Sequence, residues 1–182
     1  MILRSRTARV LAAAGGTLLI ASGLAGCAQV EDLVGGGGAE RDAETNEVTE
    51  SGTESVFDIE VGDCLKEPEG TGQQVTDVEV IPCSDEHDYE VYYAYSVDDL
   101  GEEWPGEEAI TADGDAKCNE QFASFVGVPF DQSASLWYTY YTPTQQSWSG
   151  GDTLVQCLVY EASDQNGMEI TPVTGSLEGA NR

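Results

Sequence analysis

The sequence DGDAKCNEQFASFV at residues 113–126 decides the fold class. Four of its apolar side chains recur at i, i+4, i+7 and i+8 and therefore share one face of an α-helix: Cys118, Phe122, Phe125 and Val126. Gly127 and Pro129 follow directly and are typical of a helix end. The pattern predicts one main helix over residues 113–126 with an apolar face to bury.

The segments on both sides of this helix have the composition of β-strands. Five of them alternate apolar and polar side chains or are rich in strand-favouring residues: residues 56–61, 75–81, 89–96, 136–142 and 154–161. The turn sequence PTQQSWSGGD predicts that the last two form a hairpin. The acidic segment 98–114 is predicted to be a loop.

Four cysteines lie within this part of the chain: Cys64, Cys83, Cys118 and Cys157. They form no CxxC pair and none lies within four positions of another, which disfavours both a redox motif and a zinc site made of four thiolates. Two disulfides are expected with three connectivities open, and we favour Cys64 with Cys83 and Cys118 with Cys157. The predicted fold is a small disulfide-stapled α+β domain of antiparallel strands packed on one main helix.

The N-terminus has the layout of a secretory signal. Three arginines precede a short apolar run that ends in Leu-Ala-Gly before Cys27. This LAGC sequence resembles the lipobox of bacterial lipoproteins, whose cysteine is acylated after the signal has been cleaved. We therefore expect residues 1–26 to be a lipoprotein signal peptide and Cys27 to be the lipid attachment site, which anchors the chain to the outer face of the cell membrane. The alternative is an ordinary signal peptide cleaved near Ala28.

Residues 27–55 are predicted to be the lipidated cysteine followed by a disordered acidic tether. After Gly35–Gly38 the segment is polar and has almost no large apolar side chains, so it cannot bury enough surface to offset the entropy of ordering. The folded domain is expected to span residues 56–182.

The composition is strongly acidic, with 34 Asp and Glu against 7 Lys and Arg and a formal net charge of −27. Cleavage before Cys27 would remove three arginines and leave 4 − 34 = −30. Such a charge argues against nucleic acid as a partner and against adhesion to anionic lipid headgroups. We expect the acids to form a solvated surface, and the alternative is that they attract cations or a basic partner.

His87 is the single histidine and lies among Asp85, Glu86, Asp88 and Glu90. Such a cluster can bind a divalent cation, but a catalytic metal site usually needs three protein ligands and no second histidine exists. We expect the imidazole to form a hydrogen bond that fixes the turn into the next strand, and we assign no metal ligands.

No catalytic residues are assigned either. The chain has neither a GxSxG elbow nor an SxxK motif. Paired carboxylates could serve a glycosidase, but a domain this small rarely forms the deep cleft that such an enzyme needs. We therefore expect a protein that is not an enzyme and has no cofactor.

Aromatic side chains crowd two of the predicted strands. Because neighbouring residues of a strand point to opposite faces, some of these rings should lie on an outer face. Tyr93, Trp137 and Trp148 are therefore candidates for a binding surface, together with His87 and Glu90. Trp148, in the predicted turn, is the most plausible exposed anchor. The alternative is a core of cross-strand aromatic pairs.

Several short motifs follow one another in a recognisable order: VGDCL at 61–65, IPC at 81–83, HDYEVY at 87–92, Cys118 to Val126-Gly127, Trp148 to Cys157, and GSLEG at 175–179. Together they resemble the septum formation domain of actinobacterial lipoproteins and membrane proteins, over about residues 55–180. The resemblance implies a link to cell division, makes the four cysteines disulfides, and marks His87 with Glu90 as a hallmark pair. It implies no activity, substrate or cofactor.

The sequence thus predicts a lipid-anchored, non-enzymatic protein of the cell envelope. Its domain is expected to bind a wall component such as a glycan, or an envelope or division protein, during growth or septum formation. The alternatives are a lipoprotein that binds a metal or small ligand and, last, a carboxylate-based envelope hydrolase.

Overall fold

A six-stranded antiparallel sheet organises the computed structural model, which describes residues 37–68 and 74–182. All of its neighbouring strands pair antiparallel. The order across the sheet is β3 (Gly52–Ser55), β5 (Asp77–Ile81), β4 (Cys64–Leu65), β6 (Tyr89–Ser96), β8 (Leu154–Glu161) and β7 (Leu136–Tyr141). The predicted β7–β8 hairpin is present, and β6 and β8 have the predicted bounds.

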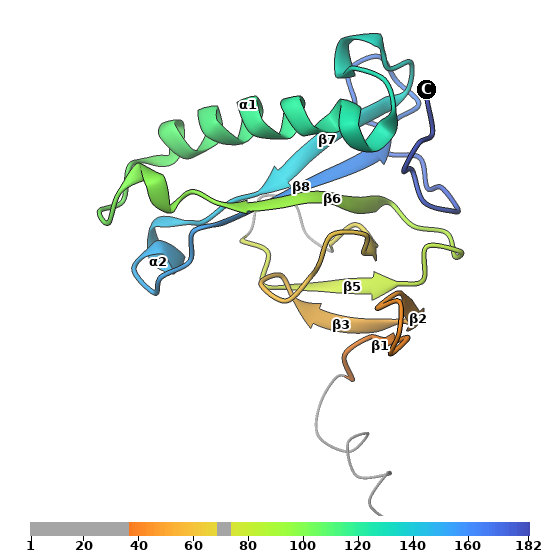
Figure 1. The fold of residues 1–182 in the computed structure, drawn as a ribbon, viewed down its shortest axis with the longest axis horizontal. Helices are drawn as coiled ribbons and strands as arrows, with labels where there is room; N and C mark the ends of the chain where they lie inside the picture. The colour runs from red at the N-terminus through yellow and green to blue at the C-terminus, as the bar shows by residue number, and fades with distance from the viewer. Residues whose placement is uncertain (1–36, 69–73) are drawn as a thin grey trace, which may run out of the picture. The chain divides into compact units, whose positions relative to one another are not determined.

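The main helix, α1 (Glu107–Val126), covers one face of β6, β8 and β7 (Figure 1). Every fourth residue along it is buried: Ile110, Gly114, Cys118, Phe122 and Val126. Phe122 meets Tyr92 of β6 edge-on at 6.1 Å between ring centroids. Gly127 ends the helix with φ at +96°, a left-handed conformation that favours glycine.

A second core lies on the other side of β6. Figure 1 shows β5 and β3 on the side of β6 that faces away from α1. The core combines Val78 and Val80 of β5 with Val91 of β6 and Leu158 of β8. The fold is therefore a small α+β domain in which two apolar clusters lie on either side of the central strands.

Two disulfides staple these layers, and they are the two pairs that the sequence favoured. Cys118–Cys157 ties α1 to β8 with 5.6 Å between the Cα atoms. Cys64–Cys83 ties β4 to the turn after β5 with 5.2 Å between the Cα atoms. Both distances lie in the ordinary range for a disulfide.

The boundary between tether and domain differs from the prediction. Residues 40–55 are not disordered, because β1 (Glu40–Arg41) pairs with β2 (Val48–Glu50) and β3 pairs with β5. The side chain of Arg41 reaches Asp63 and Glu54 and fixes this acidic segment to the domain. A count of apolar residues could not detect an attachment made by one arginine and a strand ladder. The predicted signal peptide and Cys27 lie outside the described residues.

Further details of local structure differ from the prediction. Residues 56–61 form no strand and include a turn at 56–58, and β5 begins at Asp77 instead of residue 75. The predicted loop at 98–114 holds a 3-10 turn, Asp98–Leu100, and the first two turns of α1. The hairpin connection contains a short helix, α2 (Gln145–Trp148), and a second 3-10 turn, Phe130–Gln132, precedes β7.

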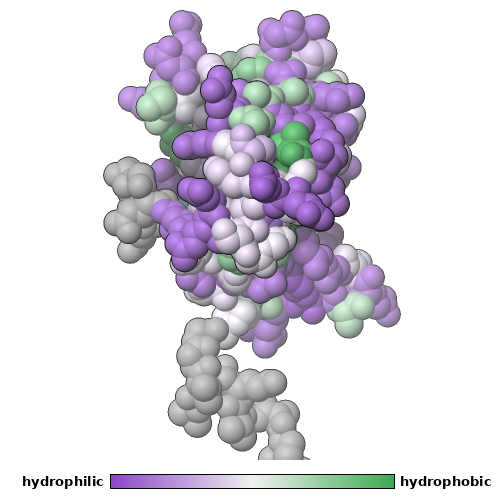
Figure 2. Space-filling model, turned by 90° about the vertical axis from the view of Figure 1, so that its left-hand side faces the viewer, coloured by the Kyte–Doolittle hydropathy of each residue, from purple (hydrophilic) through white to green (hydrophobic). Residues whose placement is uncertain are grey.

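The surface agrees with the acidic composition. In Figure 2 one face of the protein is mostly hydrophilic, with small, separate hydrophobic patches. Within the described residues, no helix has the length and apolar character needed to cross a bilayer.

Candidate functional site

His87 is placed by the turn that leads into β6. Its backbone forms a two-way bridge with Val173 of the C-terminal tail, with N–H to O distances of 2.9 and 2.8 Å. The ring is fully buried, and Nδ1 lies 3.0 Å from the carbonyl oxygen of Asp85. Because a carbonyl only accepts, Nδ1 carries the proton. The imidazole thus makes the turn-fixing contact expected of it.

The other ring nitrogen has no partner. Among the fully buried side-chain nitrogen and oxygen atoms of the described residues, only Nε2 of His87 lacks a hydrogen bond. With the proton on Nδ1, Nε2 of the neutral ring presents a lone pair. Such a buried and unpaired atom is rare in folded proteins and calls for an explanation.

Glu90 faces the same interior. It is the second residue of β6, stands opposite Cys64 of β4 in the ladder, and is only 2 % exposed. Its two oxygens accept hydrogen bonds from Ser176 Oγ and from the backbone N–H of Leu177, both at 2.6 Å. Burial raises the pKa of this carboxyl and outweighs the two hydrogen bonds, which lower it, while the charge of Glu178 raises it further.

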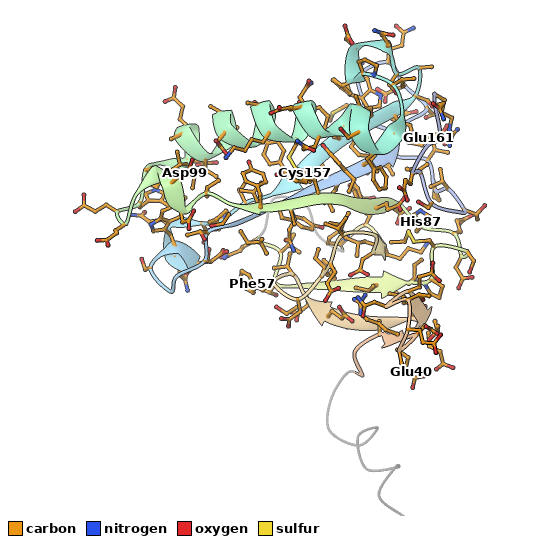
Figure 3. All side chains as sticks on the ribbon, in the orientation of Figure 1. Glu40, Phe57, His87, Asp99, Cys157 and Glu161 are labelled. Atoms are coloured by element: carbon orange, nitrogen blue, oxygen red, sulfur yellow. A yellow bond between two sulfur atoms is a disulfide. The ribbon has the colours of Figure 1, made fainter. Side chains whose placement is uncertain are left out.

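The Cys64–Cys83 disulfide completes the group. A ring nitrogen of His87, Sγ of Cys64 and a carboxylate oxygen of Glu90 all lie within 4.8 Å of one another. Figure 3 shows His87 at the start of β6, well apart from Cys157 beneath α1. In the described residues this is the one group of three such side chains close enough to hold a metal ion.

A cleft of about 670 Å³ opens next to this group, and Cys83 and Glu90 form part of its wall. The C-terminal tail closes one side, where Gly175 adopts a left-handed turn at φ +82° and its N–H donates to the carbonyl of Cys83 at 2.6 Å. The cleft's charged and apolar lining consists of three carboxylates and three hydrophobic residues: Glu47, Glu90, Glu178, Val48, Val61 and Phe125. The described residues that line it include no Lys or Arg.

The aromatic residues predicted for a binding surface do not gather at this cleft. Trp148 is buried instead of exposed, and its indole N–H donates to the carbonyl of Glu102 at 3.1 Å. Its ring packs edge-on against Trp104, which the sequence gave no reason to place there. Trp148 is therefore part of the α1-side core, and its prediction as an anchor was wrong.

Tyr93 and Trp137 are half-buried and lie apart from each other. Tyr93 stacks on Tyr95 at 5.4 Å, and Trp137 packs edge-on against Phe130 at 5.6 Å. Neither lines the cleft beside Glu90. Of the predicted set, the structure brings together only His87 and Glu90.

Sequence reasoning missed the partners that hold this site. Ser176 and Leu177 lie more than eighty residues after Glu90, and nothing in the motif GSLEG reveals that they bind its carboxylate.

Arg41 was assigned to the tether, yet it holds Asp63 beside β4 with contacts of 2.6 and 2.9 Å. The carboxylates raise the pKa of this guanidinium, the hydrogen bond with Asp63 having the largest effect.

The comparisons with known proteins give one match. A sequence model with the description "Septum formation" matches residues 61–182, which include β4 to β8, α1 and the whole tail. No curated protein and no solved structure matches the chain. The match confirms the predicted septum formation-related domain, and the chain belongs to the septum formation family.

Proposed function

We propose that this protein is a lipid-anchored, non-enzymatic component of the cell envelope that acts in septum formation. In this proposal, the cleft beside Glu90 binds a wall component or a partner protein. The family supports the link to septum formation. The observation that carries the binding role is the cleft of about 670 Å³ whose lining has three carboxylates and no basic residue.

The lining indicates the chemistry of the ligand. Glu47 and Glu178 are exposed carboxylates at the cleft, and Val61 beside them is 54 % exposed although it is apolar. A cationic group on an apolar stem would satisfy both features, since opposite charge steers the encounter and the stem covers the valine. An amino group of a wall peptide or a lysine of a partner protein has this form.

The bonds of Glu90 support binding over catalysis. A general acid or base must reach the substrate, whereas both oxygens of Glu90 already accept hydrogen bonds from the C-terminal tail. In this proposal the carboxylate holds the tail in place as the wall of the cleft.

The N-terminal pairing supports a position close to the membrane. If Cys27 carries the lipid, about a dozen residues separate it from β1, and a chain of that length spans at most roughly 40 Å. The long tether expected from the sequence would have reached further. A ligand within this distance of the outer face of the membrane fits the proposal.

The test compares two charge-reversed forms of the tagged, full-length lipoprotein in cells. Glu47→Lys with Glu178→Lys reverses the charge of the cleft, and Glu103→Lys with Glu120→Lys makes the same change at exposed sites outside it. We expect the wild type and the control to concentrate at division sites and to crosslink to wall or division components, and the cleft variant to lose both. Equal behaviour of the three forms would contradict the role of the cleft.

A further inference from the structure

We propose that the Cys64–Cys83 disulfide conceals a zinc site: once a dithiol has reduced it, Cys64, Cys83, His87 and Glu90 bind one Zn²⁺. Two of the proposed ligands, Cys83 and Glu90, also form part of the wall of the cleft, but the zinc proposal does not depend on the proposed binding of a wall component. It assigns a role to the unpaired Nε2 of His87, which neither the fold nor the cleft explains.

His87 has the hydrogen bonding of a zinc ligand. A histidine that ligates zinc usually donates its other ring N–H to a carbonyl or carboxylate, which fixes the tautomer and aims the free nitrogen at the metal. His87 already makes this contact, because Nδ1 donates to the carbonyl of Asp85 while Nε2 keeps its lone pair in a fully buried place. The hydrogen bond of Nδ1 thus leaves Nε2 free to act as a ligand before any metal is present.

The candidate ligand atoms also lie close to the distances that zinc requires. Tetrahedral zinc has bonds of about 2.0 to 2.3 Å, so its ligand atoms lie roughly 3.3 to 3.8 Å apart. The candidate atoms of Cys64, His87 and Glu90 are within 4.8 Å of one another, so small side-chain rotations would bring them into range. Each oxygen of Glu90 accepts one hydrogen bond and keeps a second lone pair for a metal.

Access supports the reduction step. Cys83 is half-buried in the wall of the cleft, whereas Cys64 is fully buried beside His87. A thiolate of the dithiol attacks Sγ of Cys83, the S–S bond breaks, and Cys64 leaves as a thiolate. The second thiol of the dithiol then attacks the mixed disulfide and releases Cys83, so the dithiol is oxidised by two electrons and the protein disulfide is reduced. Zinc binds the two thiolates, the lone pair of Nε2 and the carboxylate.

The other disulfide provides an internal contrast. Both sulfur-bearing residues of Cys118–Cys157 are fully buried between α1 and β8. In the described part of the chain, no cluster of metal-ligating side chains includes them. They should therefore resist the reductant and hold the fold while the first disulfide opens.

The experiment uses the purified full-length protein with and without a phosphine reductant. The phosphine is oxidised to its oxide, and the disulfide is reduced to the thiols of Cys64 and Cys83. Zn²⁺ binding is measured by competition with a coloured chelator, and Co²⁺ is used as a spectroscopic probe. We expect one zinc per chain only after reduction, with a thiolate-to-cobalt charge-transfer band. His87→Gln should weaken zinc binding by about 100-fold or more, whereas Glu86→Gln, an exposed neighbour, should not change it.

Folding is followed by circular dichroism in every sample. The Cys64→Ser/Cys83→Ser variant keeps His87 and Glu90 and should lose the charge-transfer band while it stays folded. Reduced wild type that binds no zinc, or His87→Gln that binds it as well as the wild type, would overturn the proposal. Reduced protein that unfolds in the presence of zinc would also overturn it, because a zinc site must hold its ligands together.

Discussion

The buried carboxylate of Glu90 makes the stability of this protein depend on pH. Burial raises its pKa in the folded protein, so the folded state binds this proton more tightly than the unfolded chain does. The corresponding stabilisation is complete below the pKa of the unfolded chain and is lost as the pH rises through the pKa of the folded protein. Relative to Glu90→Gln, the wild type should therefore lose stability as the pH rises from acidic to neutral values.

Urea unfolding of both proteins across this pH range measures the effect. The same substitution at the exposed Glu86 is the control, and its difference from the wild type should stay nearly constant. The difference in the free energy of unfolding between the wild type and Glu90→Gln could instead stay constant with pH or change in the opposite direction. Either result would contradict the predicted coupling of this carboxyl to folding.

Arg41 forms the ion pair that holds the N-terminal segment. Its side chain is 18 % exposed and pairs with Asp63, whose side chain is 4 % exposed, and it also contacts Glu54. Arg41→Gln leaves two carboxylates close together without their cation and should lower the free energy of unfolding by about 2 kcal/mol. Arg182→Gln is the matched control: its partner is Glu161, its side chain is 45 % exposed, and its loss should cost less than about 1 kcal/mol. Equal losses in urea unfolding would contradict this ranking.

At this scale, the sequence drew attention to His87 as the single histidine, and the resemblance to the septum formation domain paired it with Glu90. It could not supply their partners, since Cys64, Ser176 and Leu177 come from distant segments. The prediction that Trp148 is exposed was wrong for the same reason. Its turn position predicted exposure, but Trp104, more than forty residues earlier, covers it.

Among the elements, β6, β8 and the C-terminal part of α1, which have clear apolar or aromatic patterns, were predicted well, whereas the polar elements were not. The alternating segment 56–61 is the exception, because it forms no strand. β6 and β8 are rich in aromatic and β-branched residues and have the predicted bounds. β3 has the sequence GTES and forms only because β5 offers a ladder partner. The first turns of α1 are acidic and bury one large apolar side chain, Ile110, so their pattern gave no helical signal.

A truncation tests whether the N-terminal strands belong to the domain. A fragment of residues 56–182 lacks the β3–β5 ladder and Arg41, whereas a fragment of residues 37–182 keeps both. We expect the shorter fragment to be less stable by about 3 kcal/mol or more, from the lost ion pair and ladder hydrogen bonds. Chemical denaturation of the two fragments measures the difference. Equal stability would mean that residues 37–55 add nothing to the folded domain and that the tether extends to residue 55, as the sequence predicted.

The two disulfides should differ in what they contribute. In the chain-entropy account, Cys118–Cys157 closes a loop with a sequence separation of 39 and contributes about 4 kcal/mol, against about 3 kcal/mol for Cys64–Cys83 with a separation of 19. Replacing the first pair by alanine should therefore destabilise the protein more than replacing the second, because α1 then loses its covalent tie to β8. Unfolding curves of the two double variants measure the loss of stability for each pair. A larger loss on replacing Cys64 and Cys83 would contradict the prediction.

For the whole molecule, the dominant feature is its charge of −27, which opposes compaction by self-repulsion. Raising NaCl from about 0.01 M to about 1 M shortens the Debye length from about 30 Å to about 3 Å, which screens the many surface carboxylates. The ion pair of Arg41 and Asp63 is largely buried and loses less to this screening. The melting temperature should therefore rise with salt.

Differential scanning calorimetry at the two salt concentrations measures this shift, and a neutral osmolyte at matched osmolarity controls for effects other than screening. A melting temperature that rises with salt but not with the osmolyte would show that the acids form a solvated, mutually repelling surface. A melting temperature that stays constant or falls with salt would mean that the carboxylates are already compensated within the fold. The exposed carboxylates of the cleft, Glu47 and Glu178, would then have no surplus charge with which to attract a cationic ligand, so this measurement also bears on the proposed binding role.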